Sequence, residues 1–188
     1  MTRFLAAVLI SLALIGPASA EDKEVVEITM IFEEYRQAFA ESRFLDAAGY
    51  LHPRDVGAFR EFALPVLIEA RRTSRHKGHP ILESFFDTIP LEDTGEASDL
   101  EVRAAFDQAL TSYLPYILDS LDVDNIDNMS VELQGDDSAV VRYELHHSGI
   151  EQVVEDTLEK LDGRWHMLMV VRPREHASAL REIFDLAP

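Results

Sequence analysis

SAVVRYELHHSGIEQVVEDTLEKLDGRWHMLMVV, residues 138–171, is the stretch that decides the fold. Apolar and polar residues alternate along it, as they do in strands that bury one face. Asp162-Gly163 separates two of the alternating runs, and an Asp-Gly pair in that setting predicts a two-residue hairpin turn. The stretch therefore predicts three antiparallel strands in a meander.

A two-residue turn also predicts the register. Leu161 then lies opposite Arg164, and directly opposed side chains point to the same face of a sheet. On the preceding strand Tyr143 points inward, and His147 follows it on the concave side. The core face is thus expected to hold Val154, Asp156, Leu158, Lys160, Trp165, Met167, Met169 and Val171.

Helical periodicity dominates the residues before this sheet. The sequence predicts an α+β fold, in which N-terminal helices pack on a curved, cone-like antiparallel meander and a C-terminal helix closes the chain. We expect a restart or kink at Pro65, a mobile connection at Ile89–Ala97 and an irregular acidic segment at Leu118–Asn128. The helical half is predicted at 24–118, the sheet half at 129–171 and the last helix at 173–186.

The first twenty residues resemble a signal peptide. Arg3 precedes an apolar run at Phe4–Ile15, Gly16-Pro17 ends that run, and Ala18-Ser19-Ala20 is an A-x-A cleavage site. Residues 21–188 then form a single domain with no integral membrane segment. We expect the mature protein to be periplasmic or secreted.

Composition excludes several function classes. The chain of 188 residues has a net charge of −18, which disfavours nucleic acid as a partner because phosphate binding needs a basic surface. It has no cysteine, so disulfides, thiolate metal sites, cysteine nucleophiles and a lipoprotein anchor are excluded.

The histidines and the acidic run at 119–127 do not form a recognisable metal motif. His76 and His79 lie in a loop-forming segment, and His146 and His147 point to opposite faces of a strand. The acidic run lacks the glycine and the glutamate that an EF-hand loop requires. We predict surface histidines, no metal and no cofactor.

Several segments carry a family resemblance. A long N-terminal amphipathic helix, a short helix ending in Leu51-His52-Pro53, the strand GDDSAVVRYEL at 135–145 and the hairpin LEKLDGRWHML at 158–168 are similar to the SnoaL-like and ketosteroid-isomerase-like superfamily. The resemblance implies the cystatin-like α+β cone. It covers 25–51 and 129–171 and does not extend over 54–128.

That superfamily includes isomerases, dehydratases, ligand-binding modules and protein-interaction modules, so the resemblance does not decide the function. By analogy, Asp156 buried beside Met167 would have a raised pKa and could act as a general acid or base, and Tyr143 could donate to a developing oxyanion. The preferred interpretation is structural: a bulge turns Asp156 outward, or Asp156 is a satisfied group under the helices.

The leading functional hypothesis is an exported binding or interaction module with a small apolar pocket or a partner-binding surface. Its candidate ligand-binding residues are Tyr143, His147, Asp156, Trp165 and Met167. The expected partner is a small apolar ligand or an envelope protein, and a homodimer is possible. The alternatives are a cofactor-independent isomerase or dehydratase using Asp156 and Tyr143, and a structural envelope protein.

The signal peptide gives a direct prediction: the exported protein begins at Glu21, because Ala18-Ser19-Ala20 is the cleavage site. N-terminal sequencing of exported protein measures the first residue. Recovery of uncleaved chain from a membrane fraction would contradict it.

Overall fold

The computed structural model describes residues 20–73, 76, 78–121, 123–147 and 149–186. In chain order it has α1 (Ala20–Ala40), α2 (Phe44–Tyr50), α3 (Pro53–Arg72), α4 (Pro80–Thr88), α5 (Asp99–Tyr113), α6 (Tyr116–Leu121), a 3-10 turn at Val123–Asn125, β1 (Ile126–Leu133), β2 (Ser138–His147), β3 (Ile150–Leu161), β4 (Arg164–Met167) and α7 (Pro173–Ile183). The predicted α+β class is confirmed.

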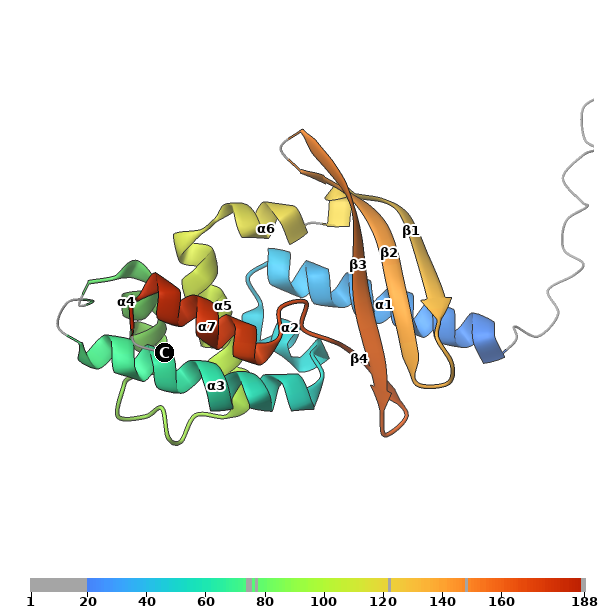
Figure 1. Cartoon of the computed structure of the whole chain (residues 1–188). Helices are drawn as coiled ribbons and strands as arrows, with labels where there is room; N and C mark the ends of the chain where they lie inside the picture. The colour runs from blue at the N-terminus through green and yellow to red at the C-terminus, as the bar shows by residue number, and fades with distance from the viewer. Residues whose placement is uncertain (1–19, 74–75, 77, 122, 148, 187–188) are drawn as a thin grey trace, which may run out of the picture.

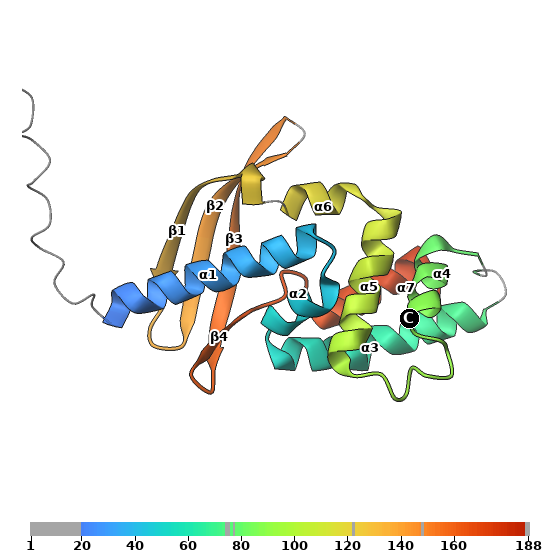
Figure 2. The same ribbon diagram turned by 180° about the vertical axis from the view of Figure 1, so that it is seen from behind.

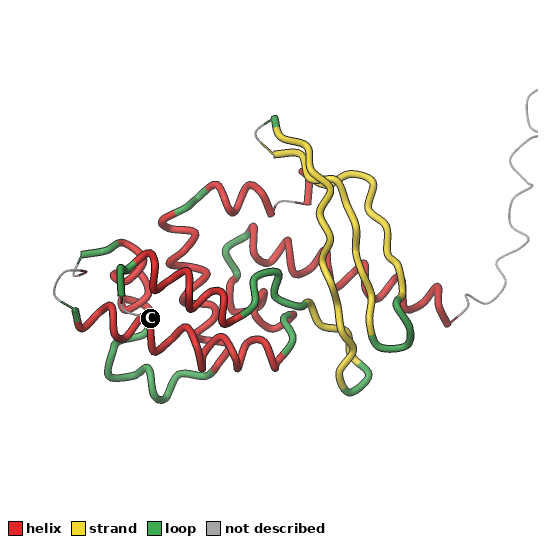
Figure 3. The backbone as a smooth tube through the Cα atoms, viewed as in Figure 1, coloured by secondary structure: helices red, strands yellow, loops and turns green. Residues whose placement is uncertain are grey.

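Strands and most helices occupy different ends of the molecule (Figure 3). α1 lies across one face of the sheet, behind it in Figure 1 and in front of it in Figure 2. α2, α3, α4, α5 and α7 gather at the other end, where α7 packs on α3 and α4 packs on α5. None of the described helices is both long and apolar enough to cross a membrane.

The sheet is a four-stranded antiparallel meander in the order β1-β2-β3-β4. Its last turn is the predicted one: Asp162 has φ 50° and Gly163 has φ 77°, and positive φ at both central residues is what a tight hairpin with Asp-Gly adopts. The predicted register is confirmed at Leu161 opposite Arg164 and along the rest of β4. β2 pairs with β3 without a bulge.

β4 ends at Met167, although the Leu168 N–H still donates to the Thr157 carbonyl at 2.8 Å. The predicted pairing is wrong from Met169 onward. The carbonyl of Met167 accepts from the His52 backbone N–H at 2.8 Å, and the Met169 N–H donates to the Asp55 carboxylate at 3.1 Å. These contacts draw the chain away from β3 toward the helices. Met169 and Val171 therefore do not extend the ladder, and Val171 is 41% exposed.

α1 buries one stripe of its surface. Ile28, Phe32 and Phe39 recur at helical spacing and are buried, the first two in the core shared with the sheet and Phe39 against Phe44 of α2. On the sheet side, Val141, Leu158 and Met167 are buried as well. Burial alternates along β2 as predicted, with Val141, Tyr143 and Leu145 inward.

The helical half begins at Pro53, which suits the first position of a helix because its missing N–H is not needed there. His52 caps α3 by accepting from the Arg54 N–H at 3.1 Å. The restart expected at Pro65 is absent, since α3 continues through it to Arg72. Ser98 and Glu101 form a capping box at the start of α5.

The segment 118–128, expected to be irregular, is helix and strand over its described residues, and the Ile89–Ala97 connection consists mostly of turns. The segment 118–128 includes most of α6 and the start of β1, where a bulge between Asp127 and Ser130 places Asn128 at φ 53°. The Ile89–Ala97 connection is held by Arg60, whose guanidinium donates to the carbonyls of Thr94, Gly95 and Ala97. Three accepting carbonyls fix the path of this connection beside α5.

Trp165 is 2% exposed on the core face of β4. Trp165→Ala should lower the free energy of unfolding by about 3–5 kcal/mol, as truncation of a large buried aromatic does. Val153→Ala, at a 63% exposed position of β3, is the matched control and should change it by less than about 0.5 kcal/mol. Urea unfolding measures both. A loss below about 1 kcal/mol at Trp165 would mean that this face of the hairpin is not part of the core.

Candidate functional site

Asp156 and Tyr143 meet inside the sheet half. The Tyr143 hydroxyl donates to Asp156 Oδ2 at 2.9 Å, and Arg36 Nη1 on α1 donates to the same hydroxyl oxygen at 2.9 Å. All three residues are buried, with exposed fractions of 6%, 3% and 2% for Asp156, Tyr143 and Arg36. Asp156 points inward, as the predicted register requires. The interpretation that a bulge turns it outward is wrong, because β2 and β3 pair without a register shift.

Sequence reasoning missed Arg36. The signal was its position, because Arg36 follows Phe32 by four residues and so lies on the buried stripe of α1. The guanidinium carbon lies 5.1 Å from the ring centroid of Tyr143 and 5.5 Å from that of Phe32. A cation at such distances from two aromatic rings is stabilised by their quadrupoles.

The environment shifts the titration of this cluster. Burial raises the pKa of Asp156, while the hydrogen bond from Tyr143 and the charge of Arg36 act to lower it. Burial, followed by the nearby Asp156 carboxylate, raises the pKa of Tyr143. The Tyr143 hydroxyl both donates and accepts within the cluster, so its hydrogen-bonding capacity is used on the inside. The cluster ties α1 to β2 and β3.

The other predicted ligand-binding residues lie in the core or outside the described part. Trp165 is buried, and the Lys160 ammonium lies 4.9 Å from its ring centroid. Met167 is buried where β4 meets Leu51. The side chain of His147, at the end of β2, is outside the described part of the structure.

A second buried ion pair lies in the helical half. Arg103 and Asp107, one turn apart on α5, form a bidentate pair at 2.8 and 2.7 Å. Tyr35 lies near this pair and near Asp156, and burial raises its pKa to about 12. Burial and the charge of Arg103 lower the pKa of His176 to about 4, so that His176 is neutral at physiological pH.

The histidines do not gather into a metal centre. His146 lies between Asp127 at 3.4 Å and Glu151 at 3.6 Å on the outer face of the sheet. His76 and His79 are half-buried against Phe184, which corrects the expectation that they are surface residues. Among the described residues no three metal-ligating side chains come together.

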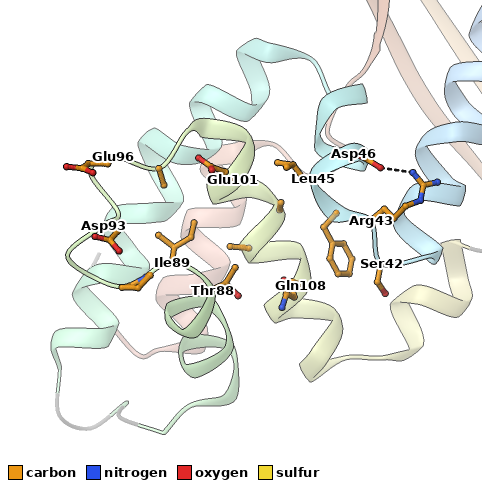
Figure 4. A pocket seen from close by; sticks show the side chains of 15 residues that line it. Ser42, Arg43, Leu45, Asp46, Thr88, Ile89, Asp93, Glu96, Glu101 and Gln108 are labelled. Carbon is orange, nitrogen blue, oxygen red and sulfur yellow. Dashed lines mark hydrogen bonds and ion pairs between the residues drawn. The ribbon is translucent and has the colours of Figure 1, made fainter.

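A groove of about 710 Å³ lies in the helical half (Figure 4). Its floor is α5, where Ala104 and Ala105 leave space because their side chains end at the β-carbon. One wall is the α1–α2 corner with Phe44 and Leu45, and the other is the connection after α4 with Ile89. The groove is lined by Ser42, Arg43, Phe44, Leu45, Asp46, Thr88, Ile89, Pro90, Asp93, Glu96, Ala97, Glu101, Ala104, Ala105 and Gln108.

None of the predicted ligand-binding side chains that the structure describes lines this groove. The sequence carries only weak signals of this groove. They are two consecutive alanines on an amphipathic helix and Leu45 on α2, which is 53% exposed. The size lies within the range of ligand sites, which are commonly 300–1,000 Å³. The groove combines an apolar floor with polar side chains at its edges, and it is open to solvent.

Comparison of the chain with protein-family models, with curated proteins and with solved structures found no match. The resemblance to the SnoaL-like superfamily therefore stays a prediction that rests on the quoted motifs.

The raised pKa of Asp156 has a measurable consequence. A carboxyl whose folded pKa exceeds its unfolded value, 3.8, stabilises the fold below that value, and the contribution is lost as pH rises through the folded pKa. Wild type should therefore lose free energy of unfolding relative to Asp156→Asn as pH rises above about 4.

Glu101→Gln provides the opposite control, because the hydrogen bond from the Ser98 backbone lowers the pKa of Glu101. Relative to this variant, wild type should lose stability as pH falls. Urea unfolding across the pH range, with carboxyl NMR of Asp156, gives both slopes. A pKa of Asp156 at or below 3.8 would show that it is held as a carboxylate in the fold.

Proposed function

We propose that this protein is an exported binding or interaction module, and that the groove between α2, α5 and the connection after α4 is its binding site. The observation that carries the proposal is the groove itself: about 710 Å³ with an apolar floor of Ala104 and Ala105 between Phe44 and Ile89. Leu45, in the wall beside Phe44, is 53% exposed. Covering exposed apolar surface of this kind with a ligand lowers the free energy.

The arrangement around Asp156 supports binding elsewhere than in the sheet half. An enzyme that used Asp156 and Tyr143 would need both side chains within reach of one substrate. The Tyr143 hydroxyl and Asp156 Oδ2 are instead hydrogen-bonded to each other, and the hydroxyl also accepts from Arg36. Asp156 and Tyr143 therefore support the fold, while the groove supplies accessible apolar surface.

The proposed compartment is the periplasm or the extracellular space, and it rests on the signal-like sequence of residues 1–20. All but the last of these residues lie outside the described part. An envelope protein or a small apolar ligand is the proposed class of partner. The fold is compatible with the SnoaL-like superfamily, whose members include such binding modules.

Nile red, a neutral apolar dye, tests the groove. Ala104→Trp places an indole on the groove floor, and Leu45→Ser removes an apolar side chain from one wall. Each variant should weaken dye binding by roughly five- to tenfold, because that is the effect of losing one well-buried apolar contact. Fluorescence titration of folded protein measures the dissociation constant. Native mass spectrometry of the purified wild type should also show any copurified ligand or dimer.

Matched controls separate the groove from general surface effects. Ser112→Trp puts the same indole at an exposed position of α5, and Leu100→Ser removes a leucine that is 39% exposed outside the groove. Both should bind dye as the wild type does. Equal binding by wild type and a folded Ala104→Trp variant would contradict the proposal.

A further inference from the structure

The edges of the groove carry negative charge. Four carboxylates line it: Asp46, Asp93, Glu96 and Glu101. Arg43 is the only cationic side chain in the lining, and its guanidinium is held by Glu41 and Asp46, each at 2.8 Å. Its charge is thus neutralised locally, and the groove as a whole attracts cations.

The connection after α4 supplies much of this charge. Residues 87–101 contain six acidic residues and no lysine or arginine. Asp93 and Glu96 form no ion pair with any described residue. Arg60 binds the backbone carbonyls of this connection from the α3 side, so it orders the acidic wall and leaves these two carboxylates to solvent.

The acidic groups lie on both sides of the apolar floor (Figure 4). Asp93 and Glu96 belong to one wall, and Asp46 to the other, with Ala104 and Ala105 of α5 between them. The hydrogen bonds from Ser98 lower the pKa of Glu101, which keeps it ionised. An occupant that matches this pattern has an apolar strip flanked by positive charges.

We propose that the groove binds a cationic amphipathic segment of a partner polypeptide, in which lysine or arginine side chains flank apolar ones. This inference rests on the proposed function and specifies its ligand. The apolar side chains lie on the alanine floor between Phe44 and Ile89. The cationic side chains reach Asp93 and Glu96 on one wall, and on the other wall Asp46, whose carboxylate also binds Arg43. This is the arrangement of a helix-in-groove complex in which the charge pattern sets specificity.

Other occupants fit the charge less well. A second copy of this chain has a net charge of −18 and is repelled over most of its surface. The N-terminal segment of the chain itself, residues 1–20, is apolar but has one basic residue, Arg3. An anionic ligand faces four carboxylates. A polypeptide segment can carry several cations together with the apolar surface that the floor requires.

Three short helical peptides form the test: one of leucine and lysine, one with glutamine in place of lysine, and one with glutamate in place of lysine. Isothermal titration at physiological ionic strength should show binding of the lysine peptide, weaker binding of the glutamine peptide and none of the glutamate peptide. Asp93→Asn combined with Glu96→Gln should weaken the lysine peptide by about three- to tenfold, because two exposed charge contacts are lost.

A control of equal charge distinguishes the groove from the general attraction of an acidic protein. Glu132→Gln combined with Asp136→Asn removes the same charge from exposed positions at the far end of the sheet, and should change affinity by less than twofold. Equal effects of the two double variants would overturn the inference, since binding would then follow net charge alone.

The outcomes also separate this inference from the proposed function. If the glutamine peptide binds as tightly as the lysine peptide and Ala104→Trp abolishes both, the groove binds apolar segments and the cationic specificity is overturned. If Ala104→Trp affects neither peptide, the groove is not the binding site and both proposals fail. Sedimentation analysis tests for self-association. If the protein self-associates and the Asp93, Glu96 double variant does not, the occupant of the groove is a second copy of this chain and the proposal of a partner polypeptide is overturned.

Discussion

Arg36 carries a guanidinium into the interior, where the sheet half places a hydrogen-bond acceptor and a carboxylate near it. Transferring an unpaired ion from water into a protein interior costs several kcal/mol, so a buried cation requires hydrogen-bond acceptors and a nearby negative group. Tyr143 on β2 and Asp156 on β3 meet this requirement from two neighbouring strands. The cluster therefore specifies how α1 crosses the sheet, because apolar packing alone would tolerate other positions along the helix.

The helical half joins the sheet through backbone contacts at one short segment. His52 and Asp55, on either side of the start of α3, bind the backbone on both sides of Leu168 and end β4 there. The chain then reaches α7, which packs on α3. This connection leaves α2 beside α5, and the connection after α4 on the other flank of α5, so the groove is a consequence of how the two halves are joined.

Buried and exposed charged residues serve different purposes. In the sheet half, Asp156 is buried and accepts a hydrogen bond from Tyr143 on the neighbouring strand. In the helical half, the buried Arg103–Asp107 pair also stabilises the fold, and the Arg103 guanidinium lies 5.0 Å from the ring centroid of Phe59. The carboxylates of Asp93 and Glu96 lie at the surface beside an apolar floor, where they are available to a partner. Burial thus separates the charges that stabilise the fold from those proposed to select a ligand.

Local sequence patterns by themselves determined the hairpin at Asp162-Gly163, the register of β4 and the inward face of β2. They could do so because turn geometry and side-chain alternation act between residues that are close in the sequence. They also determined the burial of Trp165. Only the tertiary structure decided the role of Arg36, the end of β4 and the groove. Each of these depends on segments far apart in the chain: α1 against β2 and β3, His52 against Met167, and α2 against the connection after α4. No periodicity encodes such a juxtaposition, since it follows from how completed elements pack.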